Sequence, residues 1–467
     1  MVTMPRHTIF AFAIALLGVT SAANAQRPTR AALRRTVDSL VANALAEGPV
    51  AGMSVAVVRG KDTVVMKGYG FADVENDVAA TAQSVFRIGS ITKQFTAAAV
   101  MQLVEQKKVS LDDSIGKYLP HLAARWRGAT VRQLLNHTSG IPSYTSAGAR
   151  WRNRMREDLA HDSLLAIIAG DTLDFAAGSQ WRYNNTGYYL LGMLIERVTE
   201  RSYADDIRER FAKPLGLPST LYCGLQPIIK RRAQGYQVGT DKKLVNADLL
   251  SMHQPFSAGA LCSTVGDLVA WQRALAAGRV VTPASYTAMI TAEGAAIPRR
   301  YGYGLAADTL GGRTSVEHGG GINGFNSMLI YFPSDTLSIA VLGNTNGPWV
   351  DRVANNIARA AFGVPLSAPP TPVADRPTTA AERARFAGTY QLNLPNGQKI
   401  AIRVFERDGK LLAHGEGQGE FPLLHQGNGT FGAAFDPSLR MTFASGSPSP
   451  KFMLVQGGAT MEAPRVQ

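Results

Sequence analysis

The chain has 467 residues, of which 45% are hydrophobic and 18% are charged, and its formal net charge is +13. This length can hold more than one domain, and the composition excludes a disordered or fibrous protein. Because the basic residues are scattered and no recognisable nucleic-acid-binding module accompanies them, we interpret the charge as a solvated basic surface and expect no nucleic-acid partner.

Residues 1–25 are predicted to be a secretory signal peptide. Arg6 precedes an apolar run over residues 9–17, and Ala-Asn-Ala at residues 23–25 forms a cleavage site of the A-x-A type. The apolar run is too short to span a membrane, and no later segment is long and apolar enough to do so. We therefore expect a mature protein that starts near Gln26, lacks a membrane span and is periplasmic or secreted.

The first elements of the mature chain are a helix, a pair of strands and a second helix. Apolar side chains recur at helical spacing over residues 30–45. Met53–Val58 and Thr63–Lys67 are predicted strands, joined by a Gly-Lys-Asp turn at residues 60–62. The helix from about residue 90 is apolar on nearly every side, a pattern typical of a core helix.

The middle of the chain is mainly helical, and strands return late. Helical signals run from about residue 110 to 255, and Thr264 caps a further helix. Phe325–Phe332 and Leu337–Leu342 then form a predicted hairpin, followed by a closing helix over residues 350–361. Because strands near both ends bracket a helical middle, we predict an α/β (α+β) fold, in which helices flank one mixed antiparallel sheet and a helical subdomain is inserted.

The composition changes after residue 364. Five prolines in residues 365–379 predict a stiff linker. From residue 380 to residue 467 short strands alternate with glycine turns, which predicts a small antiparallel β-barrel domain. The main domain is therefore expected to span residues 26–364.

The most informative motif is Gly89-Ser90-Ile91-Thr92-Lys93, at the start of the predicted core helix. Residues three apart on a helix share a face, so the Ser90 hydroxyl and the Lys93 amine can share a hydrogen bond. Burial lowers the pKa of a lysine, and a neutral amine can take the serine proton and so create a nucleophile. S-x-x-K is expected about once by chance in a chain this long. A second copy, from Ser114 to Lys117, falls in a predicted loop.

Two further motifs have residues that suit the same chemistry. Tyr183-Asn184-Asn185 lies in a polar loop before a predicted helix. A phenol beside a lysine ammonium can ionise more easily and relay protons, and an asparagine amide can contact a substrate carbonyl. His318-Gly319-Gly320 comes just before the predicted hairpin, where glycines let a substrate backbone approach a strand closely.

The cysteines and histidines leave one question open. Cys223 and Cys262 can form a disulfide in an exported chain, and two buried free thiols are the alternative. The eight histidines form no metal-binding motif, so neither a metal nor another cofactor is expected.

S-x-x-K, Y-x-N and a strand motif of the K/H-x-G type, in this order, resemble the serine β-lactamase and penicillin-binding-protein superfamily. The chain is most similar to its branch of class C β-lactamases, D-Ala-D-Ala carboxypeptidases and esterases, over about residues 30–365. The stretch starting at Gly388-Thr389-Tyr390 resembles the lipocalin-like β domain often appended to such hydrolases. Three other stretches also look like the family: residues 134–140 (LLNHTSG), residues 258–264 and residues 301–304 (YGYG).

The resemblance implies acyl transfer with named roles. Ser90 would attack a carbonyl, and Lys93 with Tyr183 would handle the proton. Backbone N–H groups of Ser90 and Gly321 would form the oxyanion hole beside Gly320. Asn185 and His318 would orient the substrate or Tyr183, whereas His137 is interpreted as a structural residue at a helix end.

One departure from the family pattern affects the expected substrate. Lactam-processing members have a threonine that holds the substrate carboxylate, and Gly319 stands in its place. We therefore expect an exported serine hydrolase that acts on a small ester or amide, of the esterase or D-amino-acid amidase type, with a small-molecule or peptide-like substrate. A β-lactamase or D-Ala-D-Ala carboxypeptidase is one alternative, and a non-enzymatic penicillin-binding-like protein is another. The oligomeric state stays open.

Overall fold

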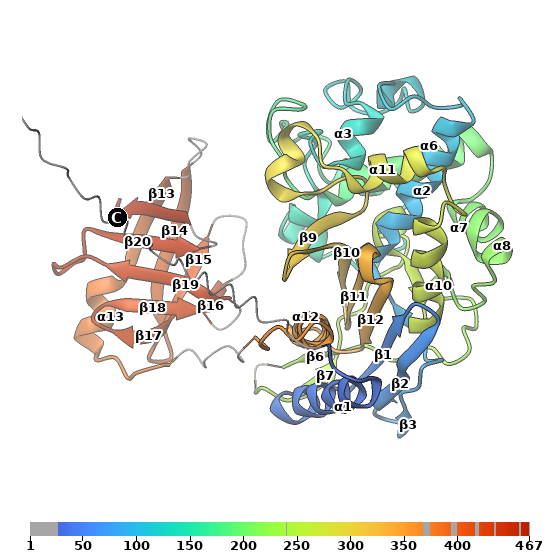
Figure 1. The fold of residues 1–467 in the computed structure, drawn as a ribbon. Helices are drawn as coiled ribbons and strands as arrows, with labels where there is room; N and C mark the ends of the chain where they lie inside the picture. Colours follow the sequence, from blue (N-terminus) through green and yellow to red (C-terminus); the bar gives the residue numbers. More distant parts are fainter. Residues whose placement is uncertain are drawn as a thin grey trace, which may run out of the picture.

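The structure is a computed structural model that describes residues 27–239, 241–367, 374–393, 399–415, 420–433, 436–456 and 459–466. The predicted signal peptide and residues 368–373 of the predicted linker lie outside this part of the chain. Among the described residues, no helix is long and apolar enough to cross a bilayer. The mixture of helices and antiparallel sheets confirms the predicted fold class (Figure 1).

A seven-stranded antiparallel sheet is the centre of the larger part of the molecule, with strand order β3-β2-β1-β12-β11-β10-β9. Strands from the two ends of the sequence meet in the middle of this sheet, where Val55 of β1 pairs with Val341 of β12, as the sequence predicts. The strands are β1 (Gly52–Arg59), β2 (Asp62–Asp73), β3 (Val78–Ala79), β9 (Ala306–Leu310), β10 (Arg313–Ile322), β11 (Phe325–Phe332) and β12 (Leu337–Gly343).

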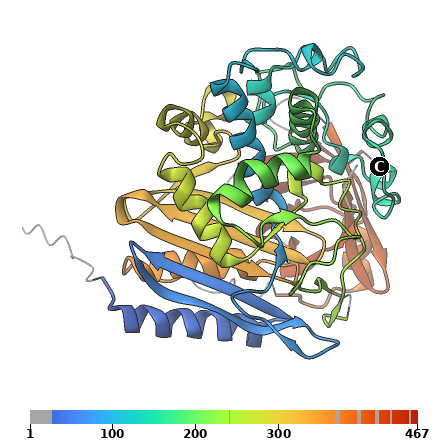
Figure 2. The same ribbon diagram turned by 90° about the vertical axis from the view of Figure 1, so that its right-hand side faces the viewer.

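Helices cover both faces of this sheet. α1 (Arg30–Glu47) and α12 (Trp349–Ala361) pack together on one face, and α2 (Thr92–Glu105) and α10 (Val265–Ala276) lie on the other side (Figure 2). β1 and β12 are buried almost throughout, which explains why both read as continuous apolar runs. Eleven of the 14 residues of α2 are buried, so the motif at its start is held in a rigid core.

The region between β3 and β9, which includes α2 and α10, is mainly helical and contains two small sheets, β4-β8-β5 and β6-β7. Its other helices are α3 (Val131–Leu135), α4 (Ala149–Arg152), α5 (His161–Ala166), α6 (Asn185–Thr199), α7 (Tyr203–Ile207), α8 (Lys213–Leu215), α9 (Phe256–Gly259) and α11 (Pro283–Ile290). Its strands are β4 (Phe86–Arg87), β5 (Leu221–Tyr222), β6 (Tyr236–Val238), β7 (Leu244–Asn246) and β8 (Leu261–Ser263).

The C-terminal strands have their own hydrophobic core, centred on residues such as Tyr390, Phe431 and Phe452. The described strands form a sheet of four and a sheet of five, linked by a single bridge from Tyr390 to Arg465. The prediction of a barrel is therefore wrong for the described residues, because no ladder joins β16 to β17. The elements are α13 (Ala380–Phe386), β13 (Gly388–Asn393), β14 (Lys399–Arg407), β15 (Lys410–Gly415), β16 (Glu420–Pro422), β17 (Leu424–Gly427), β18 (Thr430–Ala433), β19 (Asp436–Phe443), β20 (Lys451–Gln456) and β21 (Ala459–Pro464).

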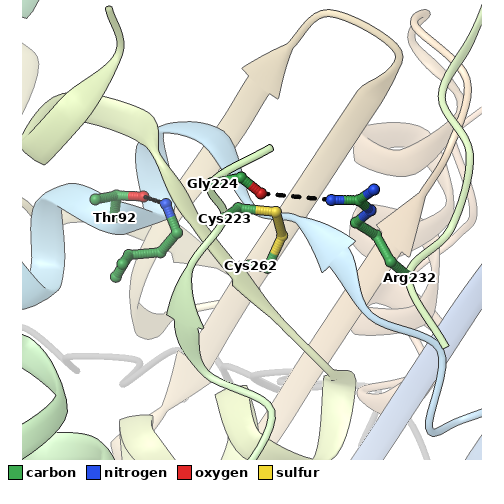
Figure 3. Close-up of a disulfide and its surroundings, with 6 residues drawn as sticks. Thr92, Cys223, Gly224, Arg232 and Cys262 are labelled. Atoms are coloured by element: carbon green, nitrogen blue, oxygen red, sulfur yellow. Dashed lines mark hydrogen bonds between the residues drawn. A yellow bond between two sulfur atoms is a disulfide. The ribbon is translucent and has the colours of Figure 1, made fainter. Parts of the chain in front are cut away.

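Cys223 and Cys262 form a disulfide, which answers the question that the sequence leaves open (Figure 3). Cys262 lies on β8, and the next residue toward the N-terminus, Leu261, donates its N–H to Thr92 Oγ1 at 3.1 Å. Leu261 also accepts a hydrogen bond from Ile88 through its carbonyl. The disulfide therefore anchors β8, the strand whose Leu261 is hydrogen-bonded to residues on both sides of the Ser90 turn.

We predict that replacing both cysteines by serine lowers the melting temperature by roughly 3–6 °C. The bridge joins residues 39 positions apart, and closing a loop of this length stabilises a protein by about 2–4 kcal/mol. Thermal unfolding of the double variant and of the wild type measures the difference. An unchanged melting temperature, together with two free thiols titrated in the oxidised wild type, would contradict this result.

Candidate active site

Ser90 lies in a tight 3₁₀ turn, Gly89–Ile91, that leads directly into α2. The turn begins with Gly89 at φ +49°, where a glycine is favoured. A Cβ atom at Gly89 would lie 3.0 Å from the backbone nitrogen of Gly321, so β10 closely approaches the turn. This approach places two backbone segments side by side at the Ser90 hydroxyl.

Lys93 is completely buried and its amine contacts three oxygen atoms. Nζ lies 3.0 Å from Ser90 Oγ, 2.8 Å from Asn185 Oδ1 and 2.8 Å from the carbonyl oxygen of Ala258 on α9. Burial holds the pKa of Lys93 well below the ordinary lysine value. Among the described residues, no carboxylate forms a hydrogen bond with the amine that would stabilise its charged form.

This geometry fits a neutral amine. A neutral amine has two N–H donors and one lone pair, and two of the three partners, Asn185 Oδ1 and the Ala258 carbonyl, can only accept. The two N–H bonds are therefore directed at these two oxygens. The lone pair of Lys93 is then left for the hydroxyl proton of Ser90, as a general base requires.

Tyr183 packs beside the amine, with the centre of its ring 4.7 Å from Lys93 Nζ. Its hydroxyl oxygen is buried and has no hydrogen-bond partner within normal distance. Burial raises the pKa of Tyr183, an effect that the nearby Ser90 hydroxyl only partly offsets. The expectation that this phenol ionises more easily is therefore wrong, because burial favours the protonated phenol.

His318 lies inside β10, paired with Leu329 of β11, and not ahead of the first strand of a hairpin as the sequence suggested. The glycine-rich run hid this strand, because glycine weakens a strand signal. Its Nδ1–H donates to the Gly319 carbonyl and its Nε2 accepts from the Tyr301 hydroxyl at 2.9 Å. Burial lowers the pKa of His318 to about 4, so the ring is neutral at pH 7.

The three glycines after His318 have different surroundings. A Cβ at Gly320 would lie 2.1 Å from the Ile88 carbonyl oxygen, so only glycine fits there. Gly319 has room for a side chain, because the nearest atoms to a Cβ there, the Ser327 carbonyl oxygen, Met328 Sδ and Asp351 Oδ1, would lie at 3.7, 3.8 and 3.9 Å. Gly321, but not Gly320, lines the cavity at Ser90.

A cavity of about 110 Å³ opens at Ser90. Tyr144 and Trp151 stand edge-to-face in its wall, and both have their polar atoms tied to Gln254, so they present apolar surface. None of the residues that the structure describes around this cavity is charged. The lining residues are Ser90, Tyr144, Thr145, Trp151, Asn185, Leu250, Pro255, Ala258, Gly259, Gly321, Ile322 and Asn323.

The structure thus brings the predicted residues together: Ser90, Asn185 and Gly321 face the cavity, and Lys93, Tyr183 and His318 stand behind or beside them. Sequence reasoning missed the wall residues Tyr144 and Trp151, which no motif marks. It also missed Tyr301 as the partner of His318, although the stretch at residues 301–304 had signalled it as family-like. The second S-x-x-K motif lies elsewhere, with Lys117 exposed and paired with Asp113.

Comparisons with known proteins agree with this site. A family model described as Beta-lactamase matches residues 37–363. A D-aminopeptidase from Brucella anthropi is 30% identical over 329 residues, which cover 69% of this chain and 61% of that protein. The chain spans 61–66% of the length of curated relatives that it matches.

Two solved structures share the fold. A D-stereospecific amidohydrolase from Streptomyces sp. is 29% identical, with a TM-score of 0.61 over 72% of this chain and 99% of the other. An octameric penicillin-binding protein homologue from Pyrococcus abyssi is 25% identical, with a TM-score of 0.63 over 92% and 99% of the two chains. Because the family model covers well over half of the sequence, the chain belongs to the β-lactamase family.

Proposed function

We propose that this protein is an exported hydrolase that cleaves a small, uncharged ester or amide through an acyl-enzyme on Ser90. The observation that carries the proposal is the wholly buried Lys93 amine, 3.0 Å from the Ser90 hydroxyl and held by two acceptors. The predicted signal peptide supports export, and the catalytic domain is proposed to span residues 26–364.

The first step forms the acyl-enzyme. Neutral Lys93 accepts the proton of Ser90 as the serine oxygen attacks the substrate carbonyl. The backbone N–H groups of Ser90 and Gly321 stabilise the oxyanion, since both segments lie at the same edge of the cavity. The C–O or C–N bond to the leaving group then breaks, and the proton held by Lys93 passes to the leaving atom.

The second step releases the acid. Water attacks the ester carbonyl, neutral Lys93 accepts a water proton, and that proton returns to the serine oxygen as it leaves. Tyr183 keeps its proton throughout. Its hydroxyl near Ser90 has no other hydrogen-bond partner and donates a hydrogen bond to the leaving atom. His318, neutral at pH 7, holds β10 in place through the Tyr301 hydroxyl.

The walls of the cavity favour an apolar acyl group. Tyr144, Trp151 and Leu250 present apolar surface around Ser90, and no cationic side chain lines the described part of the cavity to receive a carboxylate. Asn185 and Asn323 add neutral polar groups. Similarity to a D-aminopeptidase and a D-stereospecific amidohydrolase supports amides or esters of D-amino acids as the substrate class.

These features argue against the alternatives. A β-lactamase or carboxypeptidase needs a partner for a substrate carboxylate, whereas Gly319 has no side chain and no cationic residue lines the described part of the cavity. A non-enzymatic binding protein has no need of a buried lysine that lacks a carboxylate partner, because such burial is costly.

Ser90→Ala is predicted to abolish covalent labelling by a fluorophosphonate probe, because the buried Lys93 amine lies 3.0 Å from the Ser90 hydroxyl and can take its proton. Ser114→Ala is the matched control, since it changes the exposed copy of the motif, and it should label like the wild type. Intact-mass analysis of the three proteins measures the adduct. Labelling of the Ser90 variant at the wild-type level would contradict the assignment.

Lys93→Arg is predicted to lower kcat/KM for a p-nitrophenyl ester by at least about 10³-fold. Arginine stays protonated and cannot accept the serine proton. Lys117→Arg, in the exposed motif, serves as the control and should hydrolyse the ester at the wild-type rate. Circular dichroism verifies that both variants fold, and a folded Lys93→Arg enzyme that keeps its activity would rule out Lys93 as the base.

A neutral ester should react faster than the same ester with a carboxylate on its acyl chain. We expect kcat/KM for p-nitrophenyl butyrate to exceed that for mono-p-nitrophenyl glutarate by about tenfold or more, and a chromogenic cephalosporin to be slower still. A hydrogen bond to a charged group contributes about 1.5–3 kcal/mol, and this site lacks it. Equal or faster turnover of the glutarate ester would indicate a carboxylate site that the cavity does not show.

A further inference from the structure

Residues 137–145, which follow α3, take no direct part in the proposed reaction. Residues 137–141 read His-Thr-Ser-Gly-Ile and are buried almost completely. They lie beside the loop of residues 174–184, which contains Tyr183. This loop leads into α6, whose first residue is Asn185. Both catalytic side chains are therefore positioned by whatever holds this loop.

Residues 137–140 hold the loop through its backbone. The N–H groups of Asp174, Gly178 and Arg182 donate to the carbonyl oxygens of Gly140, Thr138 and His137, at 2.8, 2.7 and 3.1 Å. Gly140 has φ +72°, and a Cβ there would lie 2.0 Å from the Phe175 carbonyl oxygen. The loop thus follows this segment along its whole length.

The pairing continues to the start of α6. The Asn184 side chain donates to the Ile141 carbonyl and caps α6 by accepting from the N–H of Gly187. The N–H of Asn185 donates to Ser143 Oγ at 3.2 Å, and its side-chain amide donates to Thr145 Oγ1 at 3.1 Å. Every residue on either side of Tyr183 is therefore anchored to residues 137–145.

His137 contacts both the ring of Tyr183 and the backbone N–H of the residue that follows it. Its Nδ1 accepts the N–H of Asn184 at 3.2 Å, and its ring packs 4.4 Å from the Tyr183 ring, centre to centre. The residue has a left-handed backbone, φ +63°, a conformation that is uncommon for residues other than glycine.

We propose that residues 137–145 are the template that sets the position of Tyr183 and Asn185, and that His137 is a positioning residue whose Nδ1 fixes the backbone between them. This inference rests on the proposed function. His137 then positions Tyr183 and Asn185, whereas the sequence indicated only a structural residue at a helix end.

The geometry argues against His137 as a proton-transfer group. Its Nδ1 is occupied by a main-chain N–H, so the neutral ring has its proton on Nε2. Nε2 is buried without a hydrogen-bond partner among the rings of Tyr188, Tyr301 and Trp181. Burial also lowers the pKa of His137 well below its ordinary value, so the ring stays uncharged.

Two substitutions separate the acceptor from the backbone conformation. In His137→Asn, Oδ1 takes nearly the place of Nδ1, and asparagine tolerates a left-handed backbone. In His137→Gly the backbone is relaxed and the acceptor is gone. His121→Ala changes an exposed histidine and is the control for loss of a histidine as such.

The test is the rate at which a fluorophosphonate labels Ser90 at saturating probe, measured for each folded variant together with its melting temperature. We expect His137→Asn to label within about fivefold of the wild type and His137→Gly to label about 10- to 100-fold more slowly. The midpoint of the acidic limb of the rate against pH should be the same in the wild type and in His137→Asn, because another group supplies the base.

Three results would overturn the inference. If folded His137→Gly labels at the wild-type rate and only its melting temperature falls, His137 stabilises the fold and positions nothing. If His137→Asn is as slow as His137→Gly, or its acidic limb moves, the imidazole takes part in proton transfer. If the wild type is not labelled at Ser90 at all, the proposed function fails as well, a result that the other two do not share.

Discussion

Burial of the Lys93 amine is the constraint on which the rest of the site depends. Taking a lysine out of water is costly unless its donors are satisfied, and here two acceptors from different parts of the chain, Asn185 and the Ala258 carbonyl, meet at Nζ. The third hydrogen-bonding direction of the amine points to the Ser90 hydroxyl. α2, α6 and α9 must therefore pack closely, and Gly192 on α6 permits it, because a Cβ there would overlap Ser257. Packing of the core and activation of the serine are two results of one arrangement.

The same burial gives each neighbouring group its protonation state. Tyr183 and His318 are both buried beside Lys93, so the phenol keeps its proton and the imidazole stays neutral at pH 7. A site of neutral groups can move a proton between serine, lysine and leaving atom without creating a lasting buried charge. The uncharged cavity wall extends this property to the substrate, which is why we propose a neutral ester or amide.

Much of this could be predicted from the sequence, and the failures have physical causes. The middle strands of the central sheet and its flanking helices follow from apolar periodicity, and Ser90, Lys93, Tyr183 and Asn185 follow from motif spacing. β10 was missed because Gly319, Gly320 and Gly321 carry no side-chain pattern. The ionisation of Tyr183 was misjudged because burial is a property of the packed fold. The wall residues Tyr144 and Trp151 come from segments whose approach to Ser90 only the tertiary structure reveals, and a closed barrel was expected at the C-terminus because strand alternation does not specify closure.

The central claim is that burial holds the pKa of the Lys93 amine well below the ordinary lysine value, so that the neutral amine is available to take the serine proton. Nuclear magnetic resonance of protein labelled with ¹³C at the lysine ε-carbon, with Lys93 assigned through the Lys93→Arg variant, measures its titration directly. The account predicts that the Lys93 signal titrates well below 10.5, the ordinary lysine pKa, whereas Lys117 provides the exposed reference. A Lys93 signal that titrates at or above 10.5 would contradict the account, because the amine would then be charged and unable to take the serine proton.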